Sequence, residues 1–287
     1  CFRTNAMLIR RKNMEISRSE QPSDQGFYEI NGHKLYWERY GSDDAPDLLL
    51  LHHGLGSIRS WRRQISAFTN AGWRVIVYDR WGYGRSDSRP CFDKLFLLND
   101  ADEAYALLNH MSINRLSLLG HSDGGSIALL MASEKPDLIE SMVIVAAHIY
   151  FESKMLPGLE MISEASKQSP YSKALDREHG GNARHLVDSW VQHWMETNPQ
   201  KFDMRERLPK ITCPTLVIQG ELDEHATPQH AVDISEGIQK GQLWLIPDIH
   251  HMPAHEIPEE FNEGVLRFLA SPEAFANPCL RLEGRNV

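Results

Sequence analysis

The segment 120–125 has the sequence GHSDGG, in which Ser122 has a glycine two residues before it and another two residues after it. This Gly-x-Ser-x-Gly pattern is typical of a nucleophile elbow, a strained strand-to-helix turn that exposes the serine hydroxyl. The pattern alone also occurs in turns whose serine does no chemistry. The context favours an elbow, because an apolar run, 116–119, precedes the serine and a helix-forming run, 126–134, follows it.

Two further sets of side chains could complete a catalytic site around Ser122. A serine hydroxyl needs a general base near neutral pH, and the base needs a partner that fixes its tautomer. Asp223 follows one apolar run, and the pair His250 and His251 follows the next. The carboxyl ends of parallel strands meet at one edge of a sheet, so these side chains could meet despite their separation in sequence.

The residues alone leave the acid and the base open. Glu221 and Glu224 flank Asp223 and are alternative acids, and Asp223 could instead be a capping or turn residue. Either histidine of the pair could be the base.

Apolar runs and helix-forming segments alternate along most of the chain. Residues 26–40 are expected to form a β-hairpin that turns at Asn31 and Gly32. Strands are then expected at 48–52, 73–78, 115–119, 141–147, 213–220 and 242–246. Helices are expected from 57 or 60 to 68, and at 97–111, 126–134, 228–239 and 258–270. This order predicts an α/β fold with a mostly parallel sheet, helices on both of its faces and an N-terminal antiparallel hairpin.

One segment interrupts this alternation. Residues 148–208 have helical patterning and many aromatic side chains, with a break expected at Gly180 and Gly181. We predict that they form a helical cap, inserted into a core made of residues 25–147 and 209–271. Residues 1–24 are polar and lack the apolar region of a signal peptide, so we expect a disordered tail or one introduced by cloning. Residues 272–287 are expected to form a C-terminal tail.

The composition excludes several classes of function. The chain has 287 residues, enough for one sizeable domain, and a net charge of −9 from 30 basic and 39 acidic side chains. This charge argues against a nucleic-acid partner and against a basic membrane contact. No apolar run approaches the roughly 20 residues of a membrane span. The four cysteines lack CxxC spacing, and the 14 histidines lack an i, i+4 pair with a third ligand. We therefore expect a cytoplasmic protein with no metal and no cofactor, whose oligomeric state the sequence leaves open.

Residues 26–270 resemble the α/β-hydrolase fold family, with an order of nucleophile, acid and histidine that is typical of that family. The matching motifs are His53-Gly54-Leu55, Asp79-x-x-Gly82-x-Gly84-x-Ser86, the elbow at 120–124, Gly220-x-x-Asp223, and His251 with Glu256-x-Pro258. The resemblance implies a catalytic triad of Ser122, Asp223 and His251. It favours His251 over its neighbour by the spacing to Glu256, although His250 stands where the family usually has glycine.

The resemblance also implies an oxyanion hole and a candidate substrate anchor. The backbone N–H groups of Leu55 and Asp123 would bind the oxyanion. The Ser-Asp-Gly-Gly sequence is most similar to the valacyclovir hydrolase (biphenyl-hydrolase-like) group, in which the corresponding acid holds the α-amino group of an amino-acid ester. A second interpretation is that Asp123 is a charge at a helix N-terminus, where the dipole stabilises it by about 0.3–1 kcal/mol.

These observations lead to a functional hypothesis with two alternatives. We expect a carboxylesterase-type serine hydrolase that cleaves small-molecule esters of small to medium acyl groups through an acyl-enzyme. Asp123, His148, Trp190 and Trp194 are expected to contact the substrate. One alternative is a C–C bond hydrolase of the meta-cleavage-product type, whose Ser-Gly-Pro-Gly loop is replaced here by the sequence GLG at 54–56. The other, from a different class, is a non-catalytic ligand receptor on a hydrolase scaffold.

Overall fold

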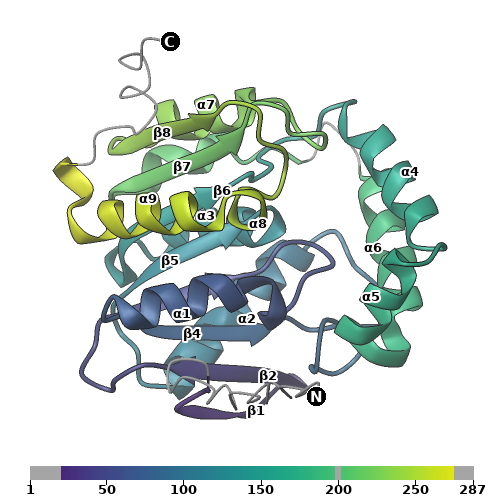
Figure 1. Cartoon of the computed structure of the whole chain (residues 1–287), viewed down its shortest axis with the longest axis horizontal. Coiled ribbons are helices and arrows are strands. Elements are labelled where there is room, and N and C mark those ends of the chain that lie inside the picture. The colour runs from purple at the N-terminus through teal and green to yellow at the C-terminus, as the bar shows by residue number, and fades with distance from the viewer. Residues whose placement is uncertain (1–20, 198–201, 275–287) are drawn as a thin grey trace, which may run out of the picture.

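The computed structural model describes residues 21–197 and 202–274 of the chain (Figure 1). These residues form one sheet with the strand order β1-β2-β4-β3-β5-β6-β7-β8. The strands are β1 (Asp24–Ile30), β2 (His33–Tyr40), β3 (Asp47–Leu51), β4 (Arg74–Asp79), β5 (Leu116–His121), β6 (Ile139–Val145), β7 (Thr215–Gly220) and β8 (Gly241–Ile246). Strands β3 to β8 run parallel, whereas β2 pairs antiparallel with both β1 and β4. The predicted α/β fold class is confirmed.

The hairpin turns where the sequence predicts it. Ile30 pairs with His33, and the two residues between them, Asn31 and Gly32, have φ angles of 52° and 84°. Two residues with positive φ suit a two-residue hairpin loop, because the twist of such a turn matches that of the strands.

Helices cover both faces of the sheet. Helices α1 (Arg62–Asn70) and α9 (Pro258–Ala270) lie on the near face in Figure 1, and α2 (Phe96–His110), α3 (Asp123–Glu134) and α7 (Gln229–Gly237) pack on the opposite face. The all-leucine run of β3 contributes to both cores, with Leu48 and Leu50 on one side and Leu49 and Leu51 on the other. A strand buried on both faces has this continuous apolar sequence.

The segment between β6 and β7 crosses the carboxyl ends of the strands. It contains α4 (Met155–Ala165), α5 (Tyr171–His179) and α6 (Ala183–Glu196), which stand together at one side of the sheet in Figure 1. The break expected at Gly180 is present, because Gly180 has a φ of 60° and a 3-10 turn, Gly180–Asn182, separates α5 from α6. We call residues 148–208 the cap, of which residues 198–201 are outside the description.

Short elements and chain ends depart from the expectations. Strand β1 begins at Asp24 and the N–H of Ser23 donates to the carbonyl of Arg39, so the predicted tail of residues 1–24 extends too far at its end. Its residues 1–20 and residues 275–287 of the predicted C-terminal tail lie outside the described residues. The short helix α8 (Pro253–Glu256) was not predicted. Among the described residues, 3-10 turns are present at Ile58–Trp61, Pro136–Leu138, Gly180–Asn182, Arg205–Lys210 and Pro272–Ala274.

Within the described residues, none of the helices combines the length and the apolar character needed to cross a membrane.

Candidate active site

Ser122 lies on a strained turn between β5 and α3. Its φ and ψ are 54° and −120°, a conformation that costs a non-glycine residue about 1–3 kcal/mol. Its N–H donates to the carbonyl of Val145 at 2.8 Å, which ties the turn to β6. A Cβ atom at Gly124 would lie 2.1 Å from the carbonyl oxygen of Leu51, and one at Gly120 would lie 2.3 Å from the carbonyl oxygen of Gly124. The strand and the helix therefore pack closely only because both positions are glycine.

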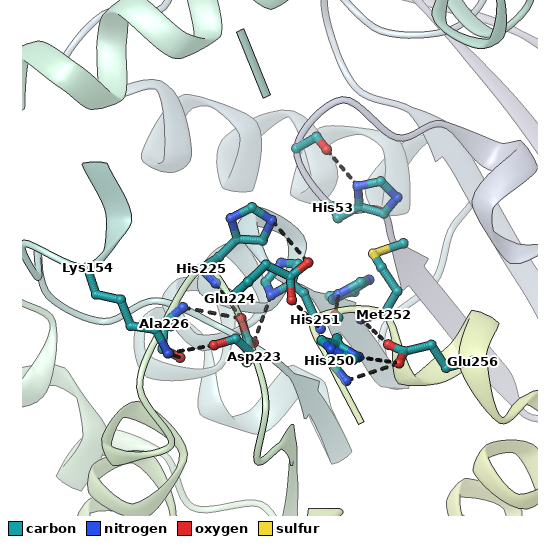
Figure 2. A network of polar contacts seen from close by, with 12 residues as sticks. His53, Lys154, Asp223, Glu224, His225, Ala226, His250, His251, Met252 and Glu256 are labelled. Atoms are coloured by element: carbon teal, nitrogen blue, oxygen red, sulfur yellow. Dashed lines mark hydrogen bonds and ion pairs between the residues drawn. The ribbon is translucent and has the colours of Figure 1, made fainter. Parts of the chain in front are cut away.

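Asp223 and His251 meet at the carboxyl ends of β7 and β8. The distance from His251 Nδ1 to Asp223 Oδ2 is 2.8 Å, and both side chains are buried (Figure 2). Gln219 donates to the same carboxylate oxygen at 2.7 Å. The other oxygen accepts the backbone N–H groups of His225 and Ala226 at 2.8 and 3.2 Å. The Asp223 carboxylate is thus held by four donors, one of which is the imidazole.

The three alternatives from the sequence lie elsewhere, and one of them, Glu221, is exposed. The side chain of His250 is 55% exposed and its Nδ1 lies 3.1 Å from Glu256 Oε2, turned away from Asp223 in Figure 2. Glu224 accepts the backbone N–H of His251 at 3.2 Å and does not take the position of Asp223. Among the candidates, this geometry favours the pair of Asp223 and His251.

The pKa values of this pair shift as expected for an ion pair. Burial raises the pKa of Asp223, but His251 and the backbone donors outweigh it and lower the value to about 2. Burial lowers the pKa of His251, but the Asp223 carboxylate outweighs it and raises the value above 6.5. The carboxylate therefore stabilises the protonated form of the imidazole.

The raised pKa of His251 predicts how hydrolysis by this site depends on pH. A general base acts in its neutral form, so kcat/KM should rise as the pH increases through the raised pKa of His251 and should fall below it. A pH profile of kcat/KM from pH 5 to 9 with p-nitrophenyl acetate measures this. An acid limb with a midpoint below the ordinary histidine pKa of 6.5 would contradict the assignment.

The loop after β3 forms a tight turn beside the elbow. The N–H of Gly56 donates to the carbonyl of His53 at 3.1 Å, and Leu55 has a φ of 61°. The Nδ1 atom of His53 lies 2.6 Å from the carbonyl oxygen of Gly54, so it donates to that oxygen. Asp123 is the first residue of α3, where backbone N–H groups have no partner within the helix. Leu55 and Asp123 line the same cavity as Ser122.

The Asp123 side chain is buried in a network of charges that the sequence did not reveal. Its Oδ2 accepts the indole N–H of Trp190 at 2.8 Å and lies 3.9 Å from Nη2 of Arg80. Arg80 is fully buried and also pairs with Asp100, which in turn pairs with Arg89. Burial raises the pKa of Asp123, and Arg80 and the indole N–H lower it in part. Two guanidinium groups thus face two carboxylates, and the protein itself balances the charge beside Ser122.

A cavity of about 430 Å³ lies between the cap and the carboxyl ends of the strands. Ser122, Asp123 and His251 line it, as do all three of the other predicted contact residues, His148, Trp190 and Trp194. The apolar side chains of the cap that line it are Met155, Leu159, Ile162, Tyr171, Ala174, Leu175, Trp190 and Trp194. This places a largely apolar wall opposite the polar side that carries the serine and the histidine.

Several histidines surround His251. The rings of His121, His148 and His225 have centroids 5.2, 5.9 and 4.7 Å from that of His251. His121 donates from Nε2 to the carbonyl of His251 at 2.8 Å, which links the elbow to the loop of the base. Burial lowers the pKa of His148 to about 3 and that of His225 to about 4, so both are neutral near pH 7. Among residues 21–197 and 202–274, no group of three potential ligands could hold a metal ion.

The chain is similar in sequence to a known protein family and to a known serine hydrolase. The model of the alpha/beta hydrolase fold family matches residues 47–175. Serine hydrolase BPHL of Homo sapiens is 31% identical over 251 residues, which cover 84% of this chain and 84% of that protein. The chain belongs to the α/β-hydrolase family. The family and this hydrolase relative together support hydrolytic activity and fit a small-molecule substrate.

More distant matches agree with this family. The 2-hydroxy-6-oxononadienedioate/2-hydroxy-6-oxononatrienedioate hydrolase of Burkholderia vietnamiensis is 27% identical over 252 residues, which cover 78% of this chain and 87% of that protein. The crystal structure of a putative lipase from Acinetobacter baumannii has a TM-score of 0.74 at 22% identity and covers 89% of this chain and 93% of its own. At that identity the likeness supports the fold alone.

Proposed function

We propose that this protein is a serine hydrolase that cleaves carboxylic esters of small to medium acyl groups through an acyl-enzyme. The observation that carries the proposal is the 2.8 Å contact between His251 Nδ1 and Asp223 Oδ2 at the wall of the cavity that Ser122 lines. Because Nδ1–H donates to the carboxylate, the neutral ring leaves Nε2 free to accept a proton.

The proposed reaction has two stages. Ser122 Oγ attacks the ester carbonyl carbon while His251 Nε2 takes the hydroxyl proton, and the N–H groups of Leu55 and Asp123 stabilise the oxyanion. Collapse of the tetrahedral intermediate breaks the bond to the alkoxy group, which receives the proton from His251. Water then attacks the acyl-enzyme with His251 as the base again, and release of the acid restores Ser122.

The cavity supports the size of the substrate. Its volume of about 430 Å³ lies in the lower half of the range of about 300–1,000 Å³ that is usual for small-molecule sites. The apolar cap wall suits an uncharged acyl or alkoxy group. A series of p-nitrophenyl esters from acetate to dodecanoate tests this, since kcat/KM should peak at short or medium chains.

A narrower part of the proposal is a preference for α-amino-acid esters through Asp123. The side chain lines the cavity next to the nucleophile, and a carboxylate there would attract an α-ammonium group. Two facts oppose a strong preference, because Oδ2 already accepts from Trp190 and Arg80 already balances the charge. We therefore expect a moderate preference, no larger than one hydrogen bond to a charged group provides.

We expect Asp123→Asn to lower kcat/KM for an aminoacyl ester by about 10- to 100-fold, the value of a hydrogen bond to a charged group. Hydrolysis of a simple acyl ester of equal size should change by less than about threefold. Asparagine keeps one acceptor for Trp190, removes the charge and replaces the second acceptor with an NH₂ donor. Glu178→Gln is the matched control, because Glu178 is another carboxylate of the cavity wall. Equal losses on both esters would refute the preference.

C–C bond hydrolysis is the second candidate. It rests on the relative from Burkholderia vietnamiensis, which is named for a 2-hydroxy-6-oxo dienedioate substrate. Its substrate carries two carboxylates, whereas the cavity wall here presents Asp123 and Glu178 with Arg59 as the one guanidinium among the described lining residues. We therefore expect esters to be hydrolysed faster than a vinylogous diketone, and the reverse order would favour the second candidate.

A further inference from the structure

One cap side chain reaches the loop that carries the proposed oxyanion hole. His179 is the last residue of α5 and is buried. Its Nε2 lies 3.0 Å from the carbonyl oxygen of Leu55, and its Nδ1 lies 2.9 Å from the backbone nitrogen of Gly84. Both partners are backbone groups of the core, so His179 bridges two core loops from the cap.

These two contacts define the tautomer of His179. The N–H of Gly84 can only donate, so Nδ1 accepts and carries no proton. The carbonyl of Leu55 can only accept, so Nε2 carries the proton. Burial lowers the pKa of His179, which favours this neutral form. The ring therefore acts as a donor toward Leu55 at neutral pH.

Leu55 needs such a restraint. Its φ of 61° is uncommon for a residue other than glycine and persists only where the surroundings hold it. His53 holds the carbonyl of the preceding residue, Gly54, at 2.6 Å, and His179 holds the carbonyl of Leu55 itself. Since peptide units are planar and trans, fixing the Gly54 carbonyl also fixes the direction of the Leu55 N–H. The two imidazoles thus hold consecutive peptide units of the turn.

The other cap helices contact the remaining parts of the site. Lys154, which precedes α4, donates to the carbonyls of Asp223 and Ala226 at 2.6 and 3.1 Å (Figure 2). Trp190 of α6 donates to Asp123 at 2.8 Å. Each of the helices α4, α5 and α6 thus has a hydrogen-bond donor, within the helix or just before it, that contacts a segment with a proposed catalytic group.

We propose that His179 is a positioning residue: by holding the Leu55 carbonyl, in the peptide unit next to the one that carries the Leu55 N–H, it maintains the positive φ of Leu55 that aims this N–H into the oxyanion hole, and so couples the docked cap to catalysis. This inference rests on the proposed serine hydrolase function. It gives the cap a second role in addition to shaping the cavity.

The test is a comparison of kcat and KM for p-nitrophenyl acetate, a substrate too small to depend much on the cap walls. His179→Leu should lower kcat by about 10- to 100-fold, the effect of a displacement of about 1 Å in the site, and should leave KM within about twofold. His179→Gln should recover part of kcat, because its amide N–H can still donate to Leu55. The control is His185→Leu, which removes a bond of the same kind from the cap to the carbonyl of Arg89.

The possible results distinguish the positioning role of His179 from the proposed hydrolase mechanism. A kcat for His179→Leu within about twofold of the wild type, or an equal loss in His185→Leu, would overturn the positioning role. Thermal unfolding checks that each variant folds. If His179→Leu does not fold, the comparison of His179→Gln with His179→Asn replaces it. The shorter asparagine amide cannot reach the Leu55 carbonyl, so His179→Asn should have the lower kcat. Equal kcat values in these two variants would overturn the inference. Equal activity of the wild type and Ser122→Ala would instead refute the hydrolase mechanism itself.

Discussion

Replacement of Ser122 by alanine should lower kcat for p-nitrophenyl acetate by about 10⁴- to 10⁶-fold. Loss of the nucleophile removes the covalent route, and only the binding and oxyanion contributions remain. Alanine keeps the Cβ atom and can retain the left-handed turn, because the N–H of residue 122 still donates to Val145. The measurement is steady-state hydrolysis by protein whose folding is checked by thermal unfolding.

The matched control is Ser133→Ala in α3, the helix that follows Ser122. Ser133 is also buried, and its hydroxyl donates to the carbonyl of Leu130, one turn earlier in the helix. Its removal should leave kcat within about twofold. Retention of more than about a tenth of the activity in Ser122→Ala would exclude Ser122 as the nucleophile.

Replacement of Asp223 by asparagine should lower kcat by about 10⁴-fold through the tautomer of His251. The amide oxygen must take the position of Oδ1, because the N–H groups of His225 and Ala226 donate there. The NH₂ group then faces Nδ1 of His251, which can accept only if the ring proton moves to Nε2. A ring protonated at Nε2 cannot take the proton of Ser122, so the base is lost although the geometry is kept.

The adjacent pair provides the control for this prediction. Glu256→Gln changes the carboxylate that faces His250 and should leave kcat within about threefold. Rates should be measured from pH 6 to 9, so that a shifted pH profile is not mistaken for a lost base. A larger loss in Glu256→Gln than in Asp223→Asn would make His250 the base.

The fold could be predicted well because its signals are local. Each strand of the parallel sheet is a short apolar run with a helix after it, and the elbow motif requires small residues where β5 and α3 touch. The hairpin follows from Asn31 and Gly32 in the same way. Boundaries were less certain, as the start of β1 at Asp24 and the unpredicted helix α8 (Pro253–Glu256) demonstrate.

The surroundings of the site could not be predicted, because they depend on contacts between residues far apart in the chain. Arg80 approaches Asp123 across 43 positions, and His179 approaches Leu55 across 124. Neither pair leaves a periodic pattern or a motif in the sequence. The choice between His250 and His251 has a similar origin, since two neighbouring residues of one loop differ only in the direction that the folded loop gives them.

The most direct test of the proposed mechanism is to locate the covalent adduct formed with a small fluorophosphonate. Intact-protein mass spectrometry counts the adducts, and peptide mapping finds the modified residue. We expect one adduct per chain, on Ser122, with none in Ser122→Ala and a much slower reaction in Asp223→Asn. Modification of another residue would contradict it, and the absence of any adduct on folded protein would favour a ligand receptor without catalytic activity.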